Sequence, residues 1–212
     1  MKLVEKTVMD FVNAVESKEP APGGGSVAAL GGSLGVALTA MVGNLTIGRK
    51  KFNELDEEVK DKFEKAFNET IDIKESLLEI IDEDTEAFNQ VMAAFKMPKE
   101  TEEEKSRRKA AINEATSLAM NVPLKAAEEC LKILKLQEVF AQYGNRNAIT
   151  DVGVGALMAY SGLEGALLNV KVNLGGLDDE ELVNNIQAKC DSILKEGKEL
   201  LEATLKVVYS KI

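Results

Sequence analysis

"PAPGGGSVAALGGSLGVALTAMVGNLTIGRKK", residues 20–51, carries no charged residue between Glu19 and Arg49. Its uncharged part is long enough to cross a bilayer, and the basic residues 49–51 would suit a cytoplasmic flank. Five interspersed serine, threonine and asparagine residues and a preference for alanine over leucine weaken that interpretation. Several glycines would each cost about 1 kcal/mol inside a helix unless a neighbouring backbone or a ligand needs the space. The stretch therefore predicts a central helix surrounded by others.

The turn before this helix is a candidate binding site. Pro20 and Pro22 favour extended chain, and the glycines at 23–25 are free to adopt positive φ. Ser26 is a natural N-cap, so the turn would present backbone N–H groups at the positive end of a long helix. Gly24, Gly25 and Ser26 could then bind an anion or a carbonyl oxygen. A simple tight turn explains the same residues, and no Walker motif is present.

The remaining sequence predicts an all-α, up-and-down bundle of long and possibly kinked helices, in one domain over residues 1–212. Apolar residues recur every three or four positions, and no alternating strand pattern competes with them. The expected elements are an amphipathic N-terminal helix with Val4, Val8, Phe11, Val12 and Val15 inward; a helix over 54–95; one that begins at a Thr101 and Glu104 capping box and is kinked or restarted at Pro123; one over 149–172; and one capped by Asp178 with Glu181.

Composition excludes several classes of function. The net charge of -10 disfavours nucleic acid and anionic membranes as partners. The chain has no histidine, which excludes imidazole-ligated zinc and serine–histidine or cysteine–histidine dyads. Cys130 and Cys190 are expected to be reduced core thiols, and the N-terminus does not resemble a signal peptide, so a cytoplasmic location is expected. Acid–base chemistry would fall to carboxylates, lysine, tyrosine or cysteine.

One carboxylate falls on a buried stripe. In "IDEDTEAF", residues 81–88, Asp84 continues the apolar series through Leu77 and Ile81, and Asp82 lies at its edge. Burial would favour the neutral form of Asp84, as a general acid near neutral pH requires. A structural role, with the carboxylate satisfied by a lysine or a backbone N–H, is equally compatible with the pattern.

A second polar series follows "GNRNAITDVGVGAL", residues 144–157. One face of the expected helix carries small and polar side chains in steps of three and four: Asp151, Gly155, Met158, Gly162, Gly165 and Asn169, with Asn173 a turn beyond. This face could admit another helix at close range or form the floor of a ligand pocket. Asp151 could also cap the helix.

These motifs together resemble one family. "PAPGGGSVAAL", "NLTIGRKK", "IDEDTEAF", "VPLKAAEE", "GNRNAITDVGVGAL" and "GALLNVKVNL" follow in the order expected for formiminotetrahydrofolate cyclodeaminases, whose relatives include methenyltetrahydrofolate cyclohydrolases. The resemblance implies an all-helical homodimer without a permanently bound cofactor or metal, acting on a tetrahydrofolate derivative. The implied reaction closes 5-formiminotetrahydrofolate to 5,10-methenyltetrahydrofolate and releases ammonia. The alternatives are the cyclohydrolase reaction, which opens the methenyl ring with water, and a non-catalytic scaffold or membrane-associated protein.

The resemblance also suggests roles for the candidate residues. We expect Asp84 or Asp151 to transfer protons, Asp82 to contact substrate, and Asn145, Asn147, Asn169 and Asn173 to orient it. Gly24, Gly25 and Ser26 with Lys50 or Lys51 would meet its carbonyl and carboxylate groups. About 25 helical residues separate the turn from the lysines by roughly 37 Å. If both ends contact substrate, they are therefore expected to come from different subunits.

Overall fold

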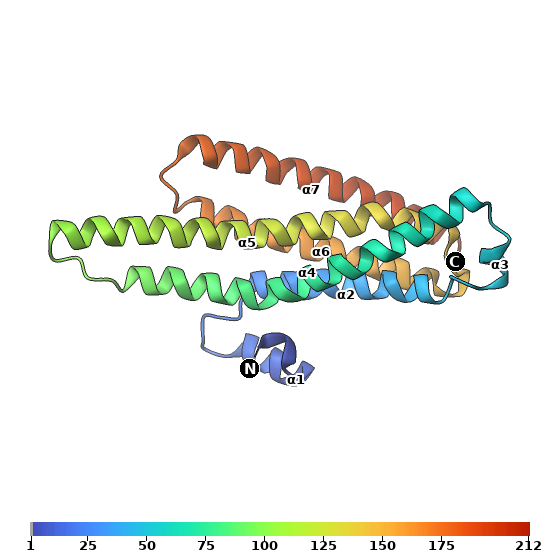
Figure 1. Cartoon of the computed structure of the whole chain (residues 1–212), viewed down its shortest axis with the longest axis horizontal. Helices are drawn as coiled ribbons and strands as arrows, with labels where there is room; N and C mark the ends of the chain where they lie inside the picture. Colours follow the sequence, from blue (N-terminus) through green and yellow to red (C-terminus); the bar gives the residue numbers. More distant parts are fainter. Residues whose placement is uncertain (1) are drawn as a thin grey trace.

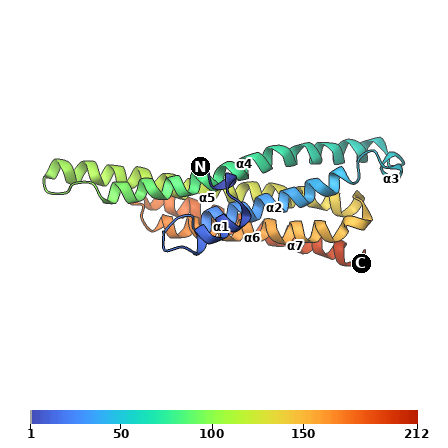
Figure 2. The same ribbon diagram turned by 90° about the horizontal axis from the view of Figure 1, so that it is seen from below.

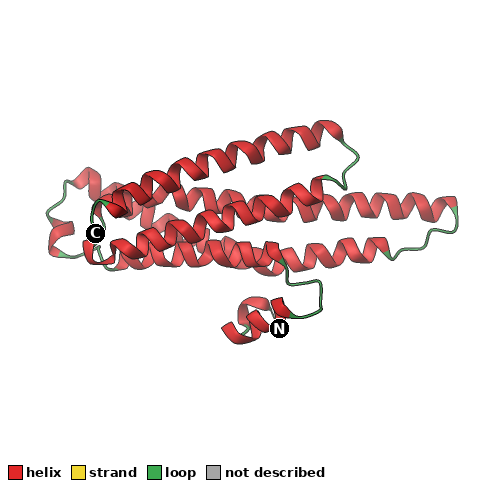
Figure 3. Cartoon of the chain, turned by 180° about the vertical axis from the view of Figure 1, so that it is seen from behind, coloured by secondary structure: helices red, strands yellow, loops and turns green. Residues whose placement is uncertain are grey.

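The computed structural model describes residues 2–212, which form an elongated helical bundle with no strand (Figures 1 and 3). The elements are η1 (Leu3–Glu5), α1 (Val8–Glu16), α2 (Gly24–Asn44), α3 (Lys50–Asn53), α4 (Glu57–Phe95), α5 (Glu102–Tyr143), η2 (Arg146–Ala148), α6 (Ile149–Leu174) and α7 (Glu180–Tyr209). Five long helices make the bundle, and the N-terminal segment with η1 and α1 lies at its side (Figure 1). The predicted all-α bundle is confirmed.

Helix α2 packs against α4, α5 and α6 and leaves one side exposed, so the prediction of a helix surrounded by others holds for only part of its surface. It is long and apolar enough to cross a membrane, but 56% of its most apolar window is buried inside the protein. Its glycines permit close helix contacts: a Cβ on Gly35 would lie 2.7 Å from the carbonyl oxygen of Gly155 and 2.8 Å from Ala159 N. Helices α2 and α6 run antiparallel and nearly backbone to backbone (Figure 2). The small-residue face predicted for residues 151–169 is therefore mainly a helix contact.

Two apolar clusters hold the bundle together. The larger one fills the space between α2, α4, α5, α6 and α7, with Leu77, Leu134 and Leu163 among its fully buried members. The smaller one lies near α3 and the C-terminus, where the Phe63 ring is 5.4 Å from that of Phe52 and 4.8 Å from that of Phe140. This second cluster fixes α3, and with it the basic residues around Lys50, against the ends of α4 and α5.

Several predicted helix boundaries are confirmed and others are wrong. Thr101 and Glu104 form the predicted capping box, and Gly144 ends α5. Pro123 lies inside α5, which continues without a restart. The cap of α7 is Asp179, whose side chain accepts from Leu182 N, because the neighbouring Asp178 forms an ion pair with Lys109.

The N-terminal segment is the largest departure from the sequence prediction. Phe11 is buried, but Val4, Val8, Val12 and Val15 are exposed. Phe11 of α1 packs into the larger apolar cluster and η1 contacts α4, whereas the rest of α1 lies at the side of the bundle (Figure 1). The amphipathic pattern identified a helix correctly, yet Phe11 is the one residue of its predicted apolar face that is buried within residues 2–212.

Candidate active site

Asp84 lies beside the first turn of α2, at one end of that helix. Helix α2 begins at Gly24 with Gly23 as N-cap, so Ser26 is not the predicted cap. Its buried hydroxyl lies 2.8 Å from the carbonyl oxygen of Ile81, 3.0 Å from Asp84 Oδ2 and 3.2 Å from Thr85 Oγ1. Since a hydroxyl has one proton, Ser26 can donate to the carbonyl or to the carboxylate and accept from Thr85. Ser26 thus ties Asp84 to the end of α2.

The glycines of the turn allow side chains from other helices to come close to the start of α2, and they do not adopt unusual backbone angles. Within residues 2–212, Gly48 is the one glycine with positive φ, so the predicted positive φ at 23–25 is wrong. A Cβ on Gly25 would collide with the Asp84 carboxylate, and one on Gly24 would lie 3.3 Å from Asn169 Nδ2. The absence of side chains therefore lets the carboxylate and the amide approach the start of the helix.

Burial raises the pKa of Asp84, and the hydrogen bonds from Ser26 oppose this rise only in part. The raised pKa means that Asp84 retains its proton to higher pH than an ordinary aspartate. A carboxyl group whose pKa is raised in this way is a candidate for exchanging protons with a bound ligand.

A cavity of about 280 Å³ opens beside Asp84. Phe88, Val91 and Val172 make its wall apolar, and Asn169 and Asn173 add two amides from α6. Both N–H groups of Asn173 are used, at 2.8 Å to the carbonyl oxygen of Ala119 and 2.9 Å to that of Asn169. Asn173 can therefore offer a ligand only its carbonyl oxygen, which suits an N–H donor. Of the predicted residues, this cavity brings together Gly24, Gly25, Asp84, Asn169 and Asn173, with Ser26 directly behind.

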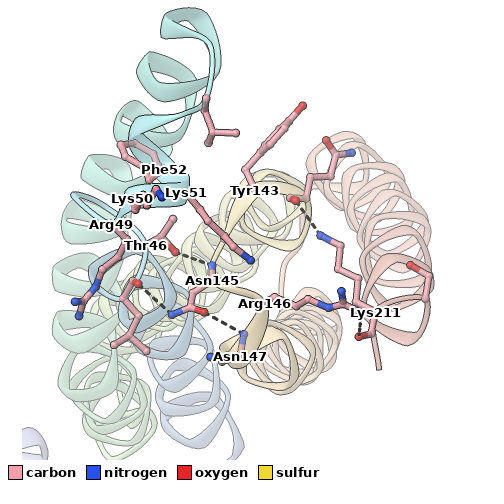
Figure 4. A pocket seen from close by; sticks show the side chains of 15 residues that line it. Thr46, Arg49, Lys50, Lys51, Phe52, Tyr143, Asn145, Arg146, Asn147 and Lys211 are labelled. Carbon is pink, nitrogen blue, oxygen red and sulfur yellow. Dashed lines mark hydrogen bonds between the residues drawn. The ribbon is translucent and has the colours of Figure 1, made fainter.

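Other predicted residues gather at the opposite end of α2. Lys50, Lys51, Asn145 and Asn147 line a larger cavity of about 820 Å³ (Figure 4). Asn145 is fixed there, because its N–H donates to Thr46 Oγ1 at 2.8 Å and its Oδ1 accepts from Asn147 N at 3.0 Å. In this arrangement Asn145 organises the chain between α5 and α6.

Besides Ser26, two predicted residues line neither cavity. Asp82 accepts a hydrogen bond of 2.6 Å from Leu3 N and so holds the N-terminal segment. Asp151 lies in the first turn of α6, whose N-cap is Ala148 without a side-chain bond. Asp151 is therefore not the cap, and it lies toward the opposite end of the antiparallel α2 and α6 pair from Asp84.

The sequence interpretation missed three cations of the larger cavity: Arg49, Arg146 and Lys211. Arg49 adjoins the predicted lysines, and Arg146 falls within the GNRN motif. Lys211 had no local signal, because it reaches the cavity from the C-terminus and donates to the carbonyl oxygens of Ala141 and Gln142.

The fold and the smaller cavity define a class: all-helical proteins with a partly buried carboxylate and two amides beside an apolar ligand cavity. Residues 7–192 match the Formiminotransferase-cyclodeaminase family, and the chain belongs to that family.

Relatives and a solved structure agree with this membership. The chain is 41% identical over 207 residues to methenyltetrahydrofolate cyclohydrolase of Methylorubrum extorquens, covering 98% of both chains. It is 35% identical over 196 residues to the formimidoyltransferase-cyclodeaminase of Rattus norvegicus, covering 92% of this chain and 36% of that protein. The crystal structure of formiminotetrahydrofolate cyclodeaminase from Thermotoga maritima superposes with a TM-score of 0.84 at 24% identity, covering 97% of each chain. That structural likeness shows the fold.

Proposed function

We propose that this protein is an enzyme of folate one-carbon metabolism and that Asp84 moves protons at the carbon between N5 and N10 of a reduced folate. The carrying observation is the combination at Asp84 of burial, a raised pKa and an adjoining apolar cavity. The apolar wall and the acceptor oxygen of Asn173 suit a flat heterocycle that carries N–H donors. The folate is the substrate in this proposal, and no permanently bound cofactor takes part.

The first candidate reaction is the cyclohydrolase reaction. Water adds to the cationic methenyl carbon of 5,10-methenyltetrahydrofolate, and the Asp84 carboxylate takes a proton from that water. The bond from the carbon to N5 then breaks, N5 receives a proton, and 10-formyltetrahydrofolate is left with one proton released overall. The relative of 41% identity, matched along the whole length of both chains, supports this candidate.

The second candidate is the cyclodeaminase reaction. N10 of 5-formiminotetrahydrofolate, whose formimino group is protonated, attacks the formimino carbon and loses a proton, while the departing amino nitrogen gains one proton and leaves as ammonia. Here one carboxyl group can take the first proton and return it to the leaving group. The family match and the 35% identity to the Rattus norvegicus protein support this candidate.

The two reactions are separated by supplying each folate to the purified protein. Formation or loss of 5,10-methenyltetrahydrofolate is followed by its ultraviolet absorbance, and ammonia is assayed in parallel. Ammonia release from the formimino substrate identifies a cyclodeaminase. Ring opening of the methenyl substrate, with no ammonia released when the formimino substrate is supplied, identifies a cyclohydrolase. If neither folate reacts or shifts the melting temperature, the non-catalytic scaffold is the better description.

Asp84→Asn tests the proposed role of the carboxylate. General acid–base catalysis contributes about 10²- to 10⁴-fold, or roughly 3–5 kcal/mol of barrier, and kcat should fall accordingly. Glu86→Gln is the matched control, because Glu86 is exposed two residues further along the same helix. Asp151→Asn tests the other predicted carboxylate. Near-normal turnover in both aspartate variants would show that these carboxylates do not carry the reaction.

A further inference from the structure

One turn of α4 holds both ends of the N-terminal segment. Near the start of the segment, Leu3 N donates a hydrogen bond of 2.6 Å to Asp82 Oδ1. Where the segment passes into α2, the Ser26 hydroxyl lies 2.8 Å from the carbonyl oxygen of Ile81, the residue next to Asp82. Residues 3–23, which we call the N-terminal loop, therefore leave α4 and return to it at neighbouring positions.

Few contacts hold the N-terminal loop to the bundle. Within the described residues 2–212, the bond from Leu3 to Asp82 is the one hydrogen bond from the loop to helices α4–α7, and the loop forms no ion pair with them. Phe11 is buried in the larger apolar cluster, and Leu3 packs partly against it. Most of α1 is exposed at the side of the bundle (Figure 1). A segment with so few contacts opens at a low cost in free energy, so the loss of one contact has a large effect.

The end of the N-terminal loop forms part of the wall of the cavity beside Asp84. Pro20, Ala21 and Gly23 line this cavity together with the Asp84 carboxylate. The positions of these wall residues follow from the path of the loop between its attachments. When the bond at Leu3 is lost, the loop is free to shift, and the wall shifts with it.

Asp82 and Asp84 face different surroundings although they lie in the same motif. Two residues apart on a helix differ by about 200° in direction, so Asp84 reaches the cavity while Asp82 does not line it. One oxygen of Asp82 is occupied by Leu3 N, and a hydrogen bond to a carboxylate is among the stronger ones in proteins. The structure thus gives the two carboxylates separate tasks.

We propose that Asp82 is a positioning residue for the reaction: it holds the N-terminal loop through Leu3, and the loop keeps the cavity wall at Pro20 and Ala21 in place. The inference rests on the proposed function of the cavity beside Asp84. Asp82 needs only an acceptor oxygen for this task, whereas a group that moves protons needs its carboxylate. Release of the loop widens the cavity around the folate ring, which weakens binding of the ground state and the transition state alike. Such a loss raises KM and leaves kcat nearly unchanged.

The first test compares two substitutions of Asp82. Asp82→Ala removes the acceptor, and KM is expected to rise roughly tenfold with kcat within about twofold of the wild type. Asp82→Asn keeps an acceptor oxygen for Leu3 N, so its KM should stay within about twofold of the wild type. Asp61→Ala, at an exposed residue near the start of the same helix, is the control and should change neither constant.

The second test removes the donor. Leu3→Pro deletes the N–H group, and proline suits this position because Leu3 begins η1 and Lys2 before it is already extended, with ψ 155°. Leu3→Ala keeps the N–H and loses the same side-chain packing, so the higher KM expected for Leu3→Pro measures the bond alone. When Asp82→Ala is also present, the two Leu3 variants should have the same KM, because no bond is left to lose.

Two further measurements separate loop release from general damage to the fold. Trypsin should cut at Lys18, an exposed residue of the loop, faster in Asp82→Ala than in the wild type or Asp82→Asn. Tetrahydrofolate, titrated against the melting temperature of each variant, should bind Asp82→Ala more weakly by the same factor as the rise in KM.

Three results would overturn the role of Asp82. Wild-type KM in Asp82→Ala would show that the buried Pro22 fixes the wall without the bond. An Asp82→Asn variant as defective as Asp82→Ala would show that the charge matters instead of the acceptor oxygen. A Leu3→Pro variant that matches Leu3→Ala in the presence of Asp82 would show that the bond is irrelevant. The proposed function fails separately, if Asp84→Asn turns over either folate as the wild type does, while trypsin cleavage and tetrahydrofolate binding still report on Asp82.

Discussion

Replacing Gly25 with alanine should separate catalysis from folding. The added Cβ would lie 2.5 Å from Cγ and 2.7 Å from Oδ2 of Asp84, whereas ordinary contacts begin at 3.4 Å. The carboxylate must therefore retreat by about 1 Å, and this also disturbs its bond to Ser26. A displacement of that size costs roughly 100-fold in rate when the displaced group takes part in the reaction.

The effect on stability should be small by comparison. A glycine to alanine change in a helix stabilises by about 0.4–1 kcal/mol, because it restricts the unfolded chain. Local displacement of a partly exposed carboxylate offsets this gain, so the melting temperature should stay within a few degrees of that of the wild type. Gly31→Ala is the control, since its nearest contact would be a Met158 oxygen at 3.7 Å.

The assay is the rate of interconversion of 5,10-methenyltetrahydrofolate, with kcat and KM determined separately for both variants. We expect kcat to fall for Gly25→Ala with both melting temperatures preserved, and Gly31→Ala to retain its kcat. Full turnover by a folded Gly25→Ala protein would refute the reasoning, because it would show that the position of Asp84 does not matter to the reaction.

Three further predictions concern the pKa of Asp84, the helix contacts and the thiols. Ser26→Ala removes the side-chain hydrogen bond that lowers the Asp84 pKa and keeps the backbone one, so the ascending limb of kcat against pH should move to higher pH; an unmoved limb would exclude the Ser26 hydroxyl from this role. Gly162→Ala places a Cβ 2.7 Å from Ala28 O and should destabilise the fold by about 1–3 kcal/mol in urea unfolding, unlike Gly165→Ala, whose nearest contact is a Cβ at 3.3 Å. Cys130 and Cys190 are buried, and burial raises the pKa of Cys130 to about 12, so a thiol reagent should label both only after unfolding; rapid labelling of native protein would contradict this.

The long helices could be predicted from the sequence because their boundaries depend on local chemistry. The Thr101 capping box and Gly144 mark the ends of α5 through bonds made within a few residues. The choice between Asp178 and Asp179 as the cap of α7 depended on Lys109, nearly seventy residues away. The direction of the α1 apolar face also escaped prediction, because periodicity identifies a face of a helix but not the surface that it meets.

The candidate site was predictable to a similar extent. Asp84 stood out because a carboxylate on an apolar stripe needs a reason, and the structure gives it a cavity and a serine partner. Its neighbour Asp82 shared the motif but holds the N-terminus instead. Lys211 reaches the larger cavity through contacts with residues about seventy positions away, and no local pattern in the sequence indicates such contacts.

The composition of α2 follows from the different surfaces around it. Its small residues allow α6 to approach, and its buried faces meet α4 and α5, so a charge on any of these sides would be desolvated without a partner. The exposed side would accept charges if it faced only water, yet Val27, Leu34 and Met41 occupy it. An apolar choice on the one side that the chain leaves open needs a further partner to explain it.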